Sequence, residues 1–449
     1  LRRVRASPGS TDPSPAPDPD GRSVTVSGRW APAQCQKPAA VGASGSLQFL
    51  LFGFAMGCSA GLAIPVARHY GAGDMAAMRR AVTTGAIISA VVAVVITLIG
   101  TLGAPALLSW LGTPPELMDQ STTFLSVFFG GAIATTAFNY LSCVIRALGD
   151  SRTPLMFLIL ACVLNVVLVI AFIWAWNFGV GGAALATVVA QLVSVILCFV
   201  LIWRRMPDLH LRRSDWVVDT DQMKESAKLG LTLGFQMSII AIGAAMLQFG
   251  INALGTDAVA AFTAAMRVDQ VAVVPLASVG VAMTTYVAQN AGARQPGRIL
   301  AGVRKAVILS VGLSVLLGLA IYFFGTQVVR VFVGDGQDHV VEMAHEYLVV
   351  NASMYAMLAV LFVIRNVIQG LGSTVAPTTA GVLELVVRGI IGIFVVQHVG
   401  FLAVVLAAPI AWLAALVPLL MAWYFHRRRL VADEHAAREK ALSQEALVS

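Results

Sequence analysis

The sequence predicts an all-α polytopic membrane protein built from two helical bundles, with five and six transmembrane helices, that are related by an internal repeat. Three observations support this fold class. Apolar residues make up 58% of the 449 residues, charged residues only 12%, and the mean hydropathy is +0.82, far from the composition of soluble domains. One eleven-residue segment occurs twice, and the apolar residues are grouped into eleven long runs.

The repeated segment is VIRALGDSRTP at residues 144–154, which returns as VIQGLGSTVAP at residues 367–377 with five of eleven positions identical. Each copy ends an apolar run, turns at a glycine (Gly149, Gly372) and ends at a proline, which suits the start of a helix because proline has no N–H to donate. Parts of residues 66–82 also reappear at residues 287–307. Two matches in the same order at nearly the same spacing indicate a duplicated unit of about 220 residues.

Each apolar run can form a helix of ~20 residues that crosses a ~30 Å hydrocarbon core. The expected spans are residues 46–67, 81–104, 122–146, 154–176, 180–203, 229–253, 258–289, 304–325, 345–369, 375–397 and 400–424. The domain organisation follows as a Pro- and Ser-rich irregular tail (1–45), an N-terminal helical lobe (46–203), a charged cytoplasmic linker (204–228), a C-terminal helical lobe (229–425) and a charged cytoplasmic tail (426–449).

Arginine and lysine predict the orientation, because cytoplasmic loops retain them. One set of alternate joints carries nearly all the basic residues, with Arg365 counted among them, whereas the opposite set carries only Arg330. We therefore expect a multi-pass protein of the cell membrane with a cytoplasmic C-terminus. The net charge of +7 is explained by these loops and requires no nucleic-acid partner; the expected surroundings are the lipid bilayer.

The first half has one span fewer than the second, and its amino-terminal tail is basic although an odd number of spans would place it outside. Both observations suggest that a first helix is missing. Gly53, Gly57 and Gly61 form a stripe of small residues that favours close helix packing. We expect an open groove along this stripe, and residues 1–45 to be irregular and outside the bundle.

Two acidic residues, Asp269 and Glu384, lie inside apolar runs, and Arg267 and Arg388 lie at similar depth. A charge at membrane depth costs at least ~2.5 kcal/mol, so it is usually paired or lines a polar cavity. Glu384 and Arg388 are four residues apart, in the favourable order for a helical ion pair, and are read either as a neutralised structural pair or as part of an ion-coupling site. Asp269 needs another partner, such as Arg388, and is a candidate for the carboxylate that couples ion binding to transport.

Neutral polar, aromatic and methionine side chains within the spans supply candidates for a substrate cavity, although each is equally explained by helix packing. These candidates are Asn139, Tyr140, Asn165, Thr187, Gln191, Gln236, Met237, Met266, Asn351 and Tyr355. Five cysteines form no CxxC pair and the histidines show no metal-ligand spacing. We therefore expect no metal site and no bound cofactor, only transported H⁺ or Na⁺.

Several strings resemble the multidrug and toxic compound extrusion (MATE) family: GCSAGLAIPVARHYGAGD at residues 57–74, IRALGDSRTP at 145–154, LNVV, GVGGAALAT at 179–187 and VAQNAGA at 287–293. The resemblance covers about residues 40–425. It implies a two-lobed exporter that alternates between outward-open and inward-open states and exchanges Na⁺ or H⁺ for amphipathic, often cationic, small molecules. Parallel repeats and bundles that gate against each other are recurrent in secondary transporters.

The chain departs from this family pattern at its ion sites. Many members carry an acid on the first helix and another four residues after the asparagine of LNVV, which is Val169 here; some carry a glutamate where the nearest polar residue here is Gln236. Ion coupling therefore falls to the C-terminal lobe. The alternative is a lipid or lipid-linked oligosaccharide flippase of related fold, which should have more arginines in its cavity. A membrane enzyme is a remote alternative, and we expect a monomer that is not an enzyme.

Overall fold

The computed structural model describes residues 31–110, 115–175, 179–216, 219–334 and 336–448, and these segments are helices joined by short turns. The first half contains α1 (Ala31–Gly71), α2 (Met75–Leu102), α3 (Ala104–Trp110), α4 (Pro115–Gly130), α5 (Ala132–Ala147), α6 (Arg152–Ile170) and α7 (Gly179–Arg205). The second half contains α8 (Thr220–Asn252), α9 (Thr256–Gly292), α10 (Pro296–Val333), α11 (Asp338–Ser353), α12 (Tyr355–Gly370), α13 (Val375–Ile390), α14 (Val396–Val399) and α15 (Phe401–Val448).

The expected eleven spans are confirmed. Among the described residues, nine helices are long and apolar enough to cross a membrane, and the count is eleven when each of two bent helix pairs is taken as one span. The bent pairs are α4 with α5 and α11 with α12, which turn by 44° and 53°. They occupy equivalent places in the two halves, so the bend was duplicated with the rest of the unit.

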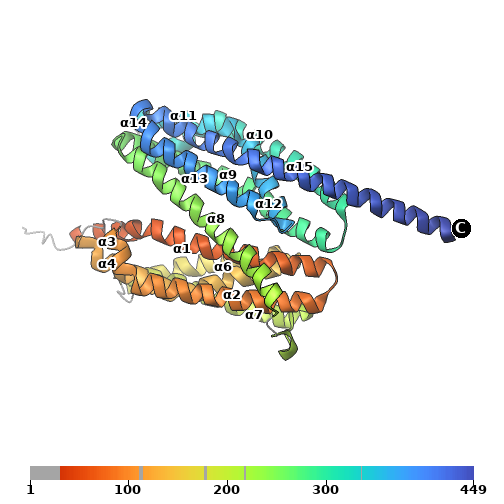
Figure 1. Cartoon of the computed structure of the whole chain (residues 1–449). Helices are drawn as coiled ribbons and strands as arrows, with labels where there is room; N and C mark the ends of the chain where they lie inside the picture. Colours follow the sequence, from red (N-terminus) through yellow and green to blue (C-terminus); the bar gives the residue numbers. More distant parts are fainter. Residues whose placement is uncertain (1–30, 111–114, 176–178, 217–218, 335, 449) are drawn as a thin grey trace, which may run out of the picture.

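The helices form two lobes, α1–α7 and α9–α15, and α8 passes from one to the other (Figure 1). Near its start, α8 lies so close to α1 that a Cβ at Gly57 or Gly61 would overlap the backbone carbonyls of Leu233 and Leu229. Near its end, Gly250 of α8 is in similarly close contact with the backbone of Gly392, which follows α13. A single straight helix therefore contacts both lobes.

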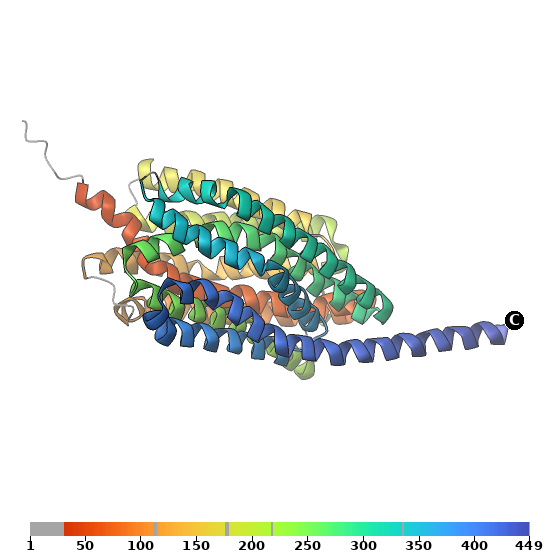
Figure 2. The same ribbon diagram turned by 90° about the horizontal axis from the view of Figure 1, so that it is seen from above.

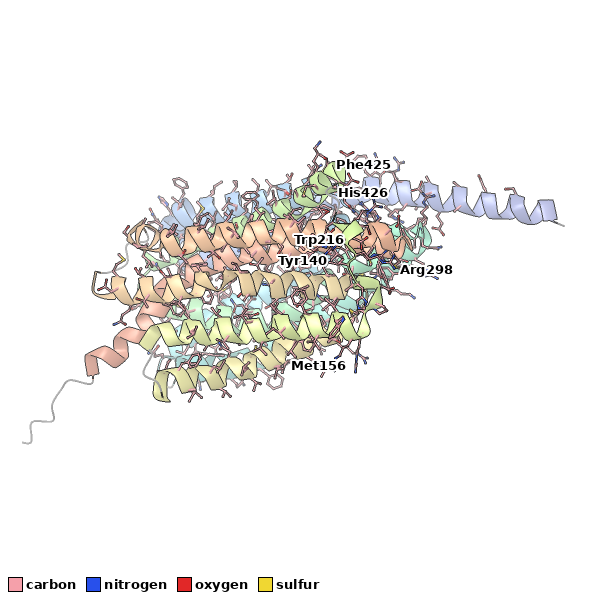
Figure 3. All side chains as sticks on the ribbon, turned by 90° about the horizontal axis from the view of Figure 1, so that it is seen from below. Tyr140, Met156, Trp216, Arg298, Phe425 and His426 are labelled. Carbon is pink, nitrogen blue, oxygen red and sulfur yellow. The ribbon has the colours of Figure 1, made fainter. Side chains whose placement is uncertain are left out.

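Apolar side chains cover the outer faces of both lobes. On α6 only Pro154 and Ala161 are buried, and Met156, labelled in Figure 3, is 66% exposed. Residues 315–324 of α10 include a similar exposed apolar surface. Figure 2 shows that the helices of both lobes run along a common direction. Exposed apolar faces on parallel helices of this length fit the hydrocarbon core of a bilayer.

The duplicated segments adopt the same turn. Gly149 and Gly372 have φ values of 104° and 81°, which favour glycine because other residues carry a Cβ that clashes there. The N–H of Gly149 donates to the carbonyl of Arg146, and the N–H of Gly372 donates to that of Gln369. Both turns lie beside the tips of α1 and α9, and we call this end of the molecule the basic end. The predicted equivalence of the two joints is confirmed.

The first joint has a helix cap that the second lacks. Asp150 accepts hydrogen bonds from the backbone N–H groups of Arg152 and Thr153 and from the Thr153 hydroxyl. Partial burial tends to raise the pKa of Asp150, but these hydrogen bonds outweigh it and lower the pKa below its usual range. The carboxylate therefore stays ionised and stabilises the start of α6.

At the basic end the two lobes meet through a reciprocal backbone contact. A Cβ at Gly71 would overlap the carbonyl of Gln289, and a Cβ at Gly292 would overlap the carbonyl of Arg68. Gly71 and Gly292 are equivalent positions of the repeat, and so are Arg68 and Gln289. The contact is therefore self-complementary, as across a twofold axis. Gln289 also donates to the carbonyl of Ala147 at 2.7 Å, which joins α9 of one lobe to α5 of the other.

Two expectations about the segments were wrong. The stripe of Gly53, Gly57 and Gly61 is not an open groove, because α8 packs along it. The tail expected to be irregular to residue 45 is helical from Ala31, where α1 begins; residues 1–30 lie outside the described residues. Within the predicted linker, residues 220–228 form the first turns of α8, and the predicted charged tail continues α15 as a helix to Val448; the cytoplasmic placement of both segments stays a prediction.

The reciprocal contact predicts that Gly292→Val loosens the junction of the lobes. The added side chain meets backbone atoms that cannot rotate away, so we expect a loss of about 1–3 kcal/mol in the free energy of unfolding. The thermal unfolding midpoint of the purified protein in detergent measures this loss. Gly312→Val is the matched control, because a Cβ at Gly312 of α10 meets open space. Equal midpoints for both variants would show that the lobes do not depend on this contact.

Candidate functional site

The second lobe contains a cavity of about 640 Å³ bounded by α8, α9, α11, α13 and α15. This volume falls within the range of small-molecule sites. Three charged side chains line it: Asp269 and Arg267 of α9 and Arg388 of α13. The cavity therefore brings together three of the four residues predicted for ion coupling.

Asp269 is held in place by a tyrosine. Its side chain is buried, and the hydroxyl of Tyr355, at the start of α12, donates to the Asp269 carboxylate at 2.7 Å. Tyr355 itself is fully buried, so the hydrogen bond lies behind the cavity wall. A hydrogen bond to an ionised carboxylate is stronger than one between neutral groups. The tyrosine thus stabilises the ionised form of an acid that also faces an open cavity.

The two arginines of the cavity are not held in this way. Throughout the described segments, neither Arg267 nor Arg388 makes a hydrogen bond or a salt bridge, and Nε of Arg388 is buried without a partner. Arg388 acts on Asp269 through its charge only. The guanidinium groups are therefore available to bind a ligand.

The predicted pair of Glu384 with Arg388 was wrong. Glu384 is buried and forms a salt bridge with Arg365 of α12, which is also buried. Arg365 was counted among the basic residues of the loops, and this was wrong, because it lies inside α12. The predicted span 345–369 already included this position. Residues four apart also lie about 6 Å apart along the helix axis, so Glu384 can meet Arg365 of α12 while Arg388, one turn farther along α13, lies against α8 and the cavity. The contact of Arg388 with Gly243 of α8 agrees with this orientation.

A second buried polar group links three helices close to that salt bridge. Gln369 of α12 donates to the side-chain oxygen of Gln236 at 2.8 Å, and Gln236 donates to the carbonyl of Pro377 at 3.1 Å. Asn351, also predicted for the cavity, is fully buried and donates to the carbonyl of Tyr347. These residues stabilise helix packing, as buried amides in membranes commonly do.

The candidates of the first lobe do not line the second-lobe cavity. Asn165 of α6 donates to the Thr187 hydroxyl of α7 at 3.0 Å, which fits a helix contact. Tyr140, labelled in Figure 3, is buried and donates to the carbonyl of Val82 at 2.7 Å. The remaining candidates are half-buried Asn139 on α5 and Gln191 on α7, and Met237, which packs near Gly57 of α1.

Of the residues predicted for a substrate cavity, Met266 lines this one, whereas several other wall residues were not predicted. Tyr347 and Trp412 also line it, as does Gln270 beside Asp269. Tyr347 and Trp412 could not be predicted from the sequence, because aromatic residues are common in packed helices. Gln270 could have been predicted, because it is a polar residue that directly follows Asp269. Within the described ranges, no group of three or more His, Cys, Asp or Glu side chains could hold a metal ion.

Comparison with known proteins agrees with this architecture. Residues 36–171 and 232–395 match the model of the MatE family. The chain belongs to the MatE family. Members of the MatE family are membrane transporters rather than enzymes, so the resemblance to MATE proteins noted in the sequence is confirmed and the enzyme alternative is excluded.

Individual MatE relatives are distant. The probable multidrug resistance protein YpnP of Bacillus subtilis (strain 168) is 28% identical over 297 residues, which are 65% of this chain and 63% of YpnP. The chain thus aligns with less than two thirds of that relative's length. Probable multidrug resistance protein YoeA of the same strain is 24% identical, over 80% of this chain and 78% of YoeA. A multidrug resistance MATE family transporter of the MOP superfamily, solved in its outward-facing conformation, shares the fold with a TM-score of 0.80 at 21% identity, over 89% of each chain.

The salt bridge between Arg365 and Glu384 makes a prediction about stability. Arg365→Met or Glu384→Gln leaves one buried charge without its partner, so each should lower the free energy of unfolding by about 3–5 kcal/mol. The double variant Arg365→Met, Glu384→Met should recover most of this loss. Thermal unfolding in detergent measures all three. Arg388→Gln is the control and should unfold close to the wild type; a loss as large as that of Arg365→Met would indicate that Glu384 depends on Arg388 instead.

Proposed function

We propose that the protein is a secondary active antiporter that exports amphipathic small molecules in exchange for H⁺ or Na⁺. The observation that carries this proposal is the charged cavity of the second lobe, in which a buried carboxylate and the space for cargo occupy the same site. The apolar wall residues suit the apolar part of an amphipathic compound. The surrounding MatE fold, with its two similar lobes, is a transporter fold.

Asp269 is the coupling carboxylate in this proposal. It is the acid that lines the cavity, whereas Glu384 is neutralised by Arg365. A proton or Na⁺ that binds Asp269 removes a negative charge from the cavity and competes with the hydrogen bond from Tyr355. Cargo and ion therefore alter each other's binding at one place, which is the requirement for exchange. Glu384 and Arg365 support the packing of α12 and α13.

The basic end is the cytoplasmic end in this proposal, because arginine and lysine are retained there, and the C-terminus lies on the same side. The protein resides in the cell membrane and acts as a monomer, since one chain supplies both lobes. The contacts of Gly71 and Gly292 close the cytoplasmic end in the present conformation. The lobes then separate at this end to admit cargo, and α8, which contacts both, transmits the movement.

Asp269→Asn should abolish gradient-driven export while leaving the amount of protein in the membrane unchanged. The change removes the group that binds the ion but keeps its size. Efflux of ethidium, rhodamine 6G and rhodamine B from energised cells that lack their own pumps measures the effect, with ionophores that collapse the H⁺ or Na⁺ gradient separately. Asp257→Asn is the matched control, because Asp257 lies exposed in the first turn of the same helix. Unchanged efflux by Asp269→Asn would exclude this residue as the coupling group.

The same assay separates the exporter from a flippase. Cells that expel the dyes in response to a gradient support export of small molecules. A protein that moves fluorescent lipids between leaflets and leaves the dyes in the cell would instead support the flippase.

A further inference from the structure

The charges of the second-lobe cavity have an unusual balance for a membrane interior. One carboxylate, Asp269, is accompanied by two guanidinium groups, Arg267 and Arg388. When Asp269 is ionised the cavity carries one excess positive charge, and when Asp269 is neutral it carries two. Among the described residues, the only side-chain hydrogen bond made by these three charged groups is the one that Tyr355 donates to Asp269. The arginines thus have no anionic partner of their own.

An unpaired guanidinium at this depth is costly, and a bound anion offsets that cost. Arginine presents a planar fork of N–H donors that matches a carboxylate or a phosphate. Nε of Arg388 is buried and lacks an acceptor, so one donor is already removed from water without compensation. A ligand that brings a carboxylate or phosphate to Arg388 supplies the missing acceptor.

A ligand with a negative group alone does not fit ion exchange. Such an anion binds best when Asp269 is protonated, so the anion and the proton would bind together rather than exclude each other. A ligand with a positive group alone meets the repulsion of two arginines. A ligand with both groups satisfies Arg388 with its anion and Asp269 with its cation, and protonation of Asp269 then releases the cationic end.

We propose that the cargo of this cavity is an amphipathic zwitterion, with a carboxylate or phosphate that binds Arg388 and Arg267 and a cationic nitrogen that binds Asp269. Phe262, Met266 and Trp412 line the same cavity and contact the apolar body of the molecule. This inference rests on the proposed function, because it names the class of cargo that the exporter carries.

Three dyes with the same xanthene skeleton test the charge requirement. Rhodamine B is a zwitterion, rhodamine 6G is its cationic ester counterpart, and fluorescein is an anion. Their binding to the purified chain in an uncharged detergent is measured by fluorescence anisotropy at neutral pH. We expect rhodamine B to bind roughly tenfold more tightly than either of the others, since only it makes both charged contacts. Because no ion gradient is present, the result does not depend on whether the protein exchanges ions.

Substitutions assign each preference to its residue. Arg388→Gln should remove the preference for rhodamine B over rhodamine 6G, and Asp269→Asn should remove the preference for rhodamine B over fluorescein. Arg388→Lys keeps the charge and should restore part of the first preference. Thermal unfolding of each variant establishes that it is folded, and Asp257→Asn serves as the control on the same helix. If the wild type binds rhodamine 6G as tightly as rhodamine B, or if folded Arg388→Gln keeps the full preference, the proposal is wrong.

The zwitterion could be a soluble compound or the headgroup of phosphatidylethanolamine, which carries a phosphate and an ammonium group. Competition with short-chain phosphatidylethanolamine, compared with phosphatidylglycerol, distinguishes the two sources. A soluble cargo predicts that rhodamine B stays bound in the presence of both lipids. A headgroup cargo predicts displacement by phosphatidylethanolamine and much less by phosphatidylglycerol, whose headgroup has no cation. Displacement by phosphatidylglycerol alone contradicts a zwitterion site.

Discussion

The two lobes depend on one short-range constraint, the reciprocal approach of backbone at Gly71 and Gly292. Carbonyl oxygens of the opposite lobe occupy the space that a Cβ would need at each glycine. The two contacts are equivalent under the internal repeat. A movement that alters both contacts equally is therefore a rotation of the lobes about the twofold axis that relates them. In the proposed cycle these contacts break when the lobes separate at the basic end, and α8, which leaves the first lobe near this end and reaches the second, limits how far the lobes can separate.

The two lobes share a backbone design but differ in chemistry. Both have the bent helix pair, the glycine turn and a π-helical turn, at residues 171–175 and 391–395. Yet among the described residues the acids buried within membrane-spanning helices, Asp269 and Glu384, both lie in the second lobe, and the cost of their buried charge is offset in different ways. Glu384 is neutralised by a permanent partner, whereas Asp269 is stabilised by a hydroxyl and faces a cavity. The two halves therefore share their geometry but not the placement of their charges.

The spans and the duplicated joints could be predicted from the sequence, because long apolar runs and glycine turns are local properties. The cavity could be predicted in part, since an acid inside an apolar run is conspicuous. What could not be predicted is which helix lies opposite a given face. The sequence favoured Arg388 as the partner of Glu384 because it is close in the chain, while Arg365 is closer in space. For the same reason the stripe that includes Gly57 was left without a partner, although α8 packs against it.

The last helix extends far beyond the thickness of a bilayer. α15 has 48 residues, which at 1.5 Å per residue corresponds to about 72 Å, against a hydrocarbon core of ~30 Å. Its two prolines, Pro409 and Pro418, lie in the first half of the helix, and farther along the Glu434 side chain contacts Gly297 of α10. Figures 1 and 2 show the remainder projecting from the bundle. A soluble domain fused to α15 beyond Glu434 without breaking the helix would be held in a fixed orientation relative to the bundle. The fusion would also make the particle large enough to be aligned in electron cryomicroscopy.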